Sequence, residues 1–146
     1  MNTLLSNYFQ DIFFRLNDSK FPYPAEIFGL QGALKGFFAS GFLERFIRQQ
    51  FGKKEINTNL VIVVPTEKDA MELEVDLRTA GVKNVRTFPW WGMIAYRAAP
   101  KGALVFGQRS SVLCYLSQTH KDVTFDDAQV IILTQRALMT PVPPPA

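Results

Sequence analysis

The chain has 146 residues, of which 47% are hydrophobic and 20% are charged, and this composition suits one globular domain with a single core. Sixteen basic residues against thirteen acidic ones give a net charge of +3, too small to indicate a nucleic-acid-binding protein by itself. A single cysteine excludes an internal disulfide, and with a single histidine it cannot form a zinc site of about four ligands. The N-terminus lacks a signal-peptide layout and no apolar run approaches the ~18 residues of a membrane span, so we expect a soluble cytoplasmic domain.

Helical spacing of apolar residues predicts an amphipathic helix within residues 1–20, which form a separate N-terminal segment. The stripe consists of Leu4, Leu5, Tyr8, Phe9, Ile12, Phe13 and Leu16. Prolines at positions 22 and 24 end this helix, and an extended piece over residues 26–30 follows. A second stripe, rich in phenylalanine, predicts the next helix: Leu34, Phe37, Phe38, Phe42 and Phe46.

The apolar run NLVIVVP, residues 59–65, lacks the polar alternation of a strand that is covered on one face. Such a run predicts a strand buried on both faces, as in a parallel sheet with helices on either side. Thr66 and Asp69 then have the spacing of a capping box at the start of a helix, and Gly81 is placed to end that helix.

The rest of the chain continues the alternation of strand and helix. We expect a strand in NVRTFP (84–89), a helix in FGQRSSVLCYLSQ (106–118) and a second fully apolar strand in AQVIILTQ (128–135). The pattern predicts an α/β fold over residues 21–140, with an open, mostly parallel sheet flanked by helices. The prolines of residues 141–146 indicate the boundary to a following domain.

In open α/β sheets, ligands bind at the carboxyl ends of the strands. Four segments are expected at those ends: GLQGALKG (29–36), PTEKDA (65–70), FPWWG (88–92) and TQRAL (134–138). These segments therefore contain most of the candidate functional residues.

The first segment is a degenerate form of the phosphate-binding loop G-x-x-x-x-G-K-[ST]. When Lys35 is taken as the motif lysine, Gly29 and Gly32 keep a glycine-rich turn. Leu34 replaces the second required glycine, however, and Gly36 replaces the Ser/Thr whose hydroxyl holds magnesium. A leucine Cβ also opposes the backbone curl that points amides at a phosphate. Lys35 either keeps an anion contact near a helix N-terminus or is simply solvated.

No strand ends in acidic residues that would hold a metal, and no carboxylate pair or Ser/Cys–His arrangement is placed for catalysis. We therefore expect this chain to bind neither nucleotide nor metal and to have no catalytic residue.

Five blocks follow the order and spacing of a known family: GLQGALKGFF, VVPTEKDAMELEVDL, FPWWGMIAY, GQRSSVLCYL and VIILTQRALMTPVPPP. In these blocks, which span residues 26–145, the chain resembles the N-terminal UvrB-like segment of the bacterial transcription-repair coupling factors. The resemblance implies a degenerate P-loop half-module of the RecA or helicase type, in keeping with Leu34 and Gly36. It implies a non-catalytic scaffold domain with no cofactor of its own.

Full-length members of this family are ATP-driven translocases on double-stranded DNA that remove stalled RNA polymerase and recruit the repair protein UvrA. The resemblance thus implies that ATP and magnesium act in a motor outside this chain, and that UvrA and RNA polymerase contact other domains. The partners expected of the chain itself are the remaining domains of the same protein and, weakly and without sequence preference, duplex DNA.

The alternative is an ATP-binding helicase-like domain of a UvrB-type DNA repair enzyme, although UvrB keeps an intact phosphate loop. Two departures from the coupling-factor pattern lie in the block FPWWGMIAY. Gly92 stands where the family usually has an acidic residue, and Ala95 stands where it has a proline. The contacts made by this loop are therefore left open.

Six residues near the strand ends are candidates for contacts with DNA or with neighbouring domains: Trp90, Trp91, Arg97, Arg109, Gln135 and Arg136. Adjacent aromatic rings beside basic side chains suit single-stranded nucleic acid, although packing within the module would use the same rings. Neighbouring side chains of an extended segment point opposite ways, so we expect one tryptophan to be buried and the other partly exposed. For Arg109 the alternative is a surface ion pair, and for Gln135 and Arg136 it is helix capping or packing.

Overall fold

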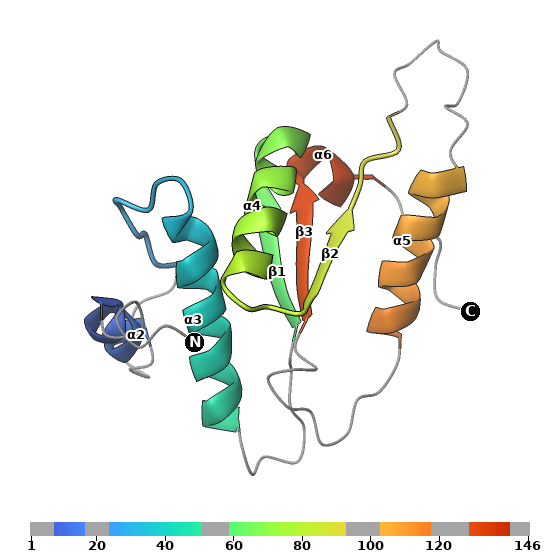
Figure 1. The fold of residues 1–146 in the computed structure, drawn as a ribbon. Coiled ribbons are helices and arrows are strands. Elements are labelled where there is room, and N and C mark those ends of the chain that lie inside the picture. Colours follow the sequence, from blue (N-terminus) through green and yellow to red (C-terminus); the bar gives the residue numbers. More distant parts are fainter. Residues whose placement is uncertain (1–7, 17–23, 51–58, 93–102, 118–128, 141–146) are drawn as a thin grey trace.

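The structure is a computed structural model, and it describes residues 8–16, 24–50, 59–92, 103–117 and 129–140 (Figure 1). Its elements are, in chain order, α2 (Gln10–Leu16), α3 (Leu34–Gln50), β1 (Asn59–Val64), α4 (Glu67–Thr79), β2 (Asn84–Phe88), α5 (Ala103–Leu116), β3 (Gln129–Thr134) and α6 (Gln135–Leu138). The expected strands and helices from residue 59 onward are all present, with small shifts at their ends. Residues 26–30, expected to be extended, belong to no strand.

The three strands run parallel in the order β1–β3–β2, so β3 is the central strand. In the register of the sheet, Val61 of β1 lies beside Ile131 of β3, and Val85 of β2 lies beside Val130. All six positions of β3 are buried, which confirms the prediction of a strand covered on both faces. The observed fold is therefore the predicted open parallel α/β sheet flanked by helices.

The same prediction is wrong for β1. Val61 and Val63 are 53% and 49% exposed, although they belong to an unbroken apolar run. Their register partners Ile131 and Leu133 are buried on the face of the sheet where α5 lies, and α5 packs against β2 rather than β1. β1 is an edge strand, so one of its faces lies beyond the reach of that helix.

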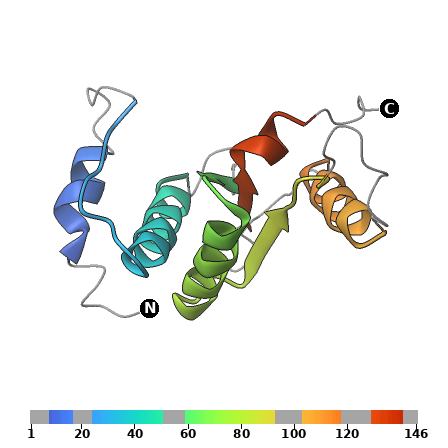
Figure 2. The ribbon, with the colours of Figure 1, turned by 90° about the horizontal axis from the view of Figure 1, so that it is seen from above.

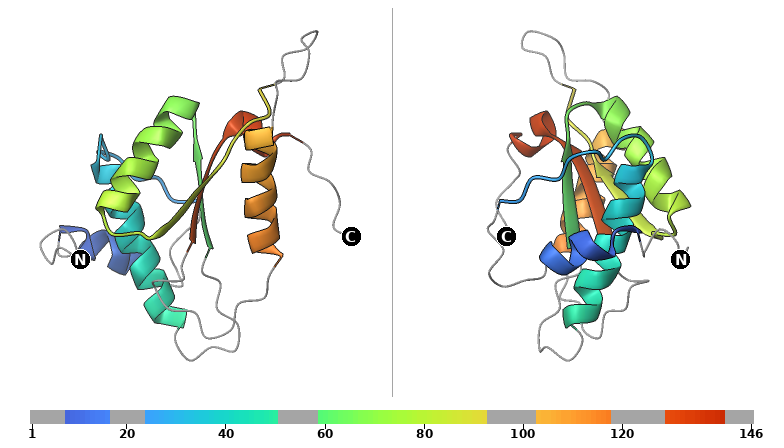
Figure 3. Two further views of the ribbon diagram at one scale, coloured as in Figure 1. Left: turned by 45° about the vertical axis from the view of Figure 1, so that its right-hand side comes forward. Right: turned by 90° about the vertical axis from the view of Figure 1, so that its left-hand side faces the viewer.

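The elements form three layers, which the left view of Figure 3 shows with the sheet nearly edge-on. α3 and α4 cover one face of the sheet, and α5 and the short α6 lie on the other. The larger core, on the α3–α4 face, contains Ala39, Leu43, Ala70, Leu73, Leu77, Val82, Val85, Val130 and Ile132. The smaller core, on the α5 face, contains Phe88, Val112, Ile131, Leu133 and Ala137.

Both ends of α4 follow the predicted chemistry. The backbone amide of Asp69 donates to Thr66 Oγ1 (3.1 Å), and the backbone amide of Thr66 donates to Asp69 Oδ2 (3.1 Å), which is the expected capping box. After the helix, Gly81 has φ +95°, a conformation that favours glycine, and its amide donates to the carbonyl of Arg78 (3.1 Å).

The N-terminal helix is confirmed over Gln10–Leu16 and packs on α3, on the side away from the sheet (Figure 2). Phenylalanine rings form this contact: Phe13 lies 5.2 Å from Phe38 and 6.4 Å from Phe42, between ring centroids. A Cβ at Gly41 would lie 2.9 Å from the Phe13 ring, so the small residue lets the two helices approach. Leu4 and Leu5 of the predicted stripe lie outside the described residues.

Candidate functional site

The glycine-rich segment 29–36 forms the predicted turn, but it does not follow a described strand as predicted. Gly29 and Gly32 have φ +85° and +53°, and α3 begins at Leu34 directly after them. No described strand precedes this turn, so the expectation that it follows a strand end is not met within those residues. Two amides at the start of α3 already have acceptors within the turn: Leu34 N donates to Gln31 O (3.2 Å), and Lys35 N donates to Gly32 O (3.3 Å). Lys35 itself is exposed.

Gly36 is a packing residue between two helices. It is buried in α3 against Asp76 and Leu77 of α4, near the C-terminal end of α4. A Cβ at position 36 would lie 2.5 Å from Asp76 Cβ and 2.9 Å from the Asp76 carbonyl carbon, closer than real Cβ atoms come. A serine or threonine, which a magnesium-holding loop requires here, has no room. Close packing of α3 against α4 therefore explains the glycine at position 36.

The other three segments do lie at the carboxyl ends of the strands, which we call the strand-end edge. Thr134, the last residue of β3, links two of them: its Oγ1 donates to Glu67 Oε1 at the start of α4 (3.1 Å). The same oxygen accepts from the backbone amide of Ala137 (3.3 Å) and so caps α6. The capping role considered for Gln135 and Arg136 thus belongs to Thr134, and both of those residues are exposed.

Trp90 and Arg136 come together at the strand-end edge. The Arg136 guanidinium lies over the Trp90 ring, 5.4 Å from its centroid. Trp90 is half-buried and packs against the core that contains Phe88 and Leu133. The predicted candidates at positions 90 and 136 are therefore one pair that joins the end of β2 to α6.

Arg109 is the most buried charged residue among those that the structure describes. It is 2% exposed, and it extends from α5 beneath the end of β2. Its guanidinium lies over two rings, 4.0 Å from the centroid of Phe88 and 4.9 Å from that of Trp91. Nη1 donates to the carbonyl of Pro89 (2.9 Å), whereas the buried Nη2 has no hydrogen-bond partner among the described residues.

The surface ion pair considered for Arg109 is therefore wrong. Burial lowers the pKa of the guanidinium below its ordinary value, because the charged form loses hydration. The sequence places this arginine on a helix but gives no signal that the helix faces the end of β2. Arg97, the other arginine candidate of this region, lies outside the described residues.

The expected difference between the two tryptophans is not found, since both are half-buried. Trp91 lies over Arg109 and 6.3 Å from the ring of Phe106 on α5, between ring centroids. Each tryptophan thus contacts one arginine, and both rings remain partly open to solvent. Instead of one buried and one exposed tryptophan, the structure has two half-buried tryptophans, each in contact with an arginine.

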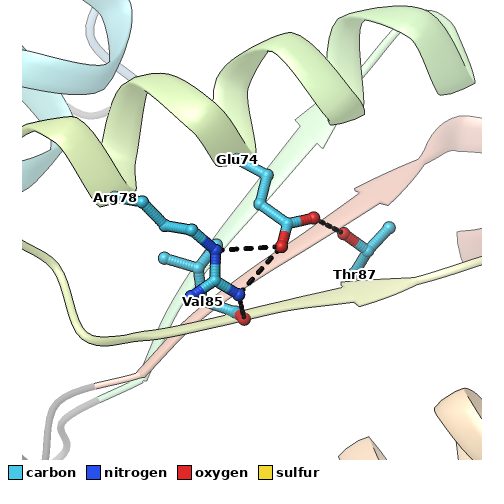
Figure 4. Close-up of polar contacts among 4 residues, drawn as sticks. All are labelled: Glu74, Arg78, Val85 and Thr87. Atoms are coloured by element: carbon cyan, nitrogen blue, oxygen red, sulfur yellow. Dashed lines mark hydrogen bonds and ion pairs between the residues drawn. The ribbon is translucent and has the colours of Figure 1, made fainter.

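Sequence reasoning missed a second polar cluster, along the outer edge of β2, which we call the Glu74 network (Figure 4). Glu74 Oε1 accepts from Arg78 Nη2 (2.8 Å) and Nε (3.1 Å), and Glu74 Oε2 accepts from Thr87 Oγ1 (3.0 Å). Arg78 Nη2 also donates to the backbone carbonyl of Val85 (3.1 Å). The i,i+4 spacing of Glu74 and Arg78 indicates an ion pair on the helix. No sequence pattern indicates that these two side chains also bind Thr87 and Val85 of β2.

The Glu74 network borders an open groove of about 440 Å³ between α4, β2 and α5. On its other side, Arg86 Nη1 donates to Ser111 Oγ (2.6 Å), and the Arg86 guanidinium lies 5.6 Å from the centroid of Tyr115. Glu74 and Arg86 are thus both engaged with neighbouring side chains. These contacts join the elements that line the groove: Glu74 links α4 to β2, and Arg86 links β2 to α5.

Within the described ranges, no group of three or more histidine, cysteine, aspartate or glutamate residues could hold a metal ion. No helix in those ranges is long and apolar enough to cross a membrane. Comparisons of the chain with protein-family models, with curated proteins and with solved structures found no match.

Proposed function

We propose that the chain is a non-catalytic UvrB-like scaffold domain of a transcription-repair coupling factor. The order and spacing of the five sequence blocks supports this family, and one structural observation supports the absence of catalysis. Gly36, at the position where a working loop has its magnesium-binding hydroxyl, is packed so closely against Asp76 that no side chain fits.

The glycine turn supports the same proposal. The amides of Leu34 and Lys35 donate to carbonyls of the turn, and Leu34 keeps a Cβ where phosphate loops have glycine. A domain with this loop would act through its surface. In the proposal, ATP and magnesium, UvrA and RNA polymerase belong to other domains of the full-length protein, and this domain holds neighbouring domains and contacts duplex DNA only weakly.

A calorimetric titration of the chain with Mg-ATP tests the proposal. We expect no saturable binding at millimolar nucleotide. Saturable binding tighter than about 1 mM, which corresponds to about −4 kcal/mol, would instead support the alternative, an ATP-binding helicase-like domain of a UvrB-type repair enzyme.

The family assignment has a separate test in the coding sequence downstream of Ala146. The proposal expects a helicase motor with an intact G-K-[ST] loop there. A reading frame that continues into an unrelated domain would contradict it.

A further inference from the structure

Arg109 differs from the other arginines whose contacts the structure describes. Arg78 and Arg86 each donate to oxygen atoms of neighbouring side chains, and Arg136 is open to water. Arg109 is nearly fully buried, and its Nη1 donates to the carbonyl of Pro89. Nη2 has lost water without gaining a partner among the described residues.

Such an arrangement is costly, because a buried guanidinium gives up strong hydration and needs oxygen acceptors in return. The rings of Phe88 and Trp91 offer π-electron density to the cation but no oxygen for the free N–H groups. The carbonyl of Pro89 accepts from Nη1, and it leaves Nη2 without an acceptor among the described residues. Among the described residues, the site thus lacks an oxygen acceptor for Nη2.

Carboxylates and phosphates both supply such oxygens, and the surroundings favour a carboxylate on a protein surface. Phe106, three residues before Arg109 on α5, is 61% exposed and lies beside the half-buried Trp91. This apolar border suits an acidic side chain flanked by apolar ones. A phosphate backbone would instead require a row of basic residues, and its bases would need open ring faces. Arg109 and Arg136 each already lie over one of the two tryptophans.

We propose that Arg109 is the receptor for an aspartate or glutamate side chain of a partner protein, which enters beside Trp91. Trp91 is the side chain that must turn aside, since it is half-buried and covers the guanidinium at 4.9 Å. A carboxylate on Nη2 would form the charge-assisted contact for which arginine is suited. This inference goes beyond the proposed function, because it assigns a contact residue and the chemistry of the partner.

The test is a selection of random short peptides, displayed on phage, against the whole chain. We expect the selected peptides to share an acidic residue next to apolar ones. Replacing that glutamate by glutamine should weaken the peptide at least about tenfold, the loss expected for one charge-assisted hydrogen bond. Because Trp91 covers the guanidinium of Arg109, tryptophan fluorescence should report binding directly.

Arg109→Met should abolish the preference for glutamate over glutamine, while Arg86→Met is the matched control. Arg86 also lies over an aromatic ring, that of Tyr115, yet it has its own oxygen partner on Ser111. Circular dichroism checks folding. If Arg109→Met does not fold, Arg109→Lys keeps the charge without the planar fork and should weaken the same peptide at least about threefold.

Three results would overturn the inference: peptides without an enriched acid, equal binding by the Arg109 variants, or binding of oligothymidylate that depends on Arg109. The last result would assign the site to nucleic acid. Binding of Mg-ATP would remove the proposed function and leave this inference standing. Loss of the preference for an acidic residue would remove this inference and leave the proposed function standing.

Discussion

The two edge strands of the sheet, β1 and β2, share the same parallel neighbour but are covered differently. Around β2, the Glu74 network links α4 to the outer edge of the strand, and Arg86 links the strand to Ser111 of α5. Around β1, Val61 and Val63 present apolar side chains to solvent on the α5 face. The chain thus completes one edge with its own side chains and leaves the other partly uncovered within the described residues.

This difference concerns how an edge strand is protected from pairing with another chain. An uncovered strand edge can pair with another chain, and proteins protect such edges with charged groups or covering elements. The carbonyl of Val85 on β2 is protected in this way by Arg78. On β1, Val61 and Val63 stay about half-exposed on the α5 face of the sheet.

The largest expected loss of stability comes from a change in the helix layer formed by α3 and α4, which covers one face of the sheet. Gly36→Thr should destabilise the chain by about 3 kcal/mol, because the new side chain must displace the backbone of α4 at Asp76. The matched control is Gly107→Ala in α5, where an added Cβ meets nothing and should stabilise the helix by about 0.5–1 kcal/mol. Chemical denaturation measures both, and an unaffected Gly36→Thr variant would show that the two helices are further apart than described.

The comparison of the edges is tested directly by one chemical change made on each strand. Val85→Thr on β2 should cost about 2 kcal/mol, because Val85 is 5% exposed and the new hydroxyl would be buried in the larger core. Val61→Thr on β1 should change stability by less than about 0.5 kcal/mol, since half of that side chain is in solvent. Because Val61 lies on the α5 face and Val85 on the α3–α4 face, equal losses in urea unfolding would mean that β1 is covered on the α5 face as well as β2 is on the other.

The fold was largely predictable because its signals are local. The capping box at Thr66 and Asp69 lies within one helical turn, and the apolar run of β3 corresponds to a strand buried on both faces. β1 has an equally apolar run, and only the strand order determines that it lies at an edge. No local pattern encodes that order.

The sequence predicts where the candidate residues lie, at the carboxyl ends of the strands, but it does not predict which of them contact one another. The candidates at positions 90, 91, 109 and 136 do meet at the strand-end edge, in two arginine–tryptophan pairs. The burial of Arg109 depends on how α5 packs against β2, which its sequence neighbours do not reveal. The motif predicts only that Gly36 lacks a magnesium ligand, and the structure adds the close contact with Asp76. Motif reading identifies which residue is unusual, and packing explains why.

The smallest expected effect sharpens the comparison at β2. Glu74→Gln should destabilise the chain by about 1 kcal/mol, because the amide that replaces one carboxylate oxygen cannot accept and the charge opposite Arg78 is lost. Glu72→Gln is the control on the same helix: Glu72 pairs with Lys68 at the same i,i+4 spacing (3.6 Å), but both side chains are largely exposed and the loss should be below about 0.3 kcal/mol. The Glu74 effect should persist in salt better than the Glu72 effect, since its carboxylate is less exposed and also bonds Thr87. Equal small losses for both variants in urea unfolding would show that the Glu74 network is an ordinary surface pair and that the edge of β2 is no better protected than that of β1.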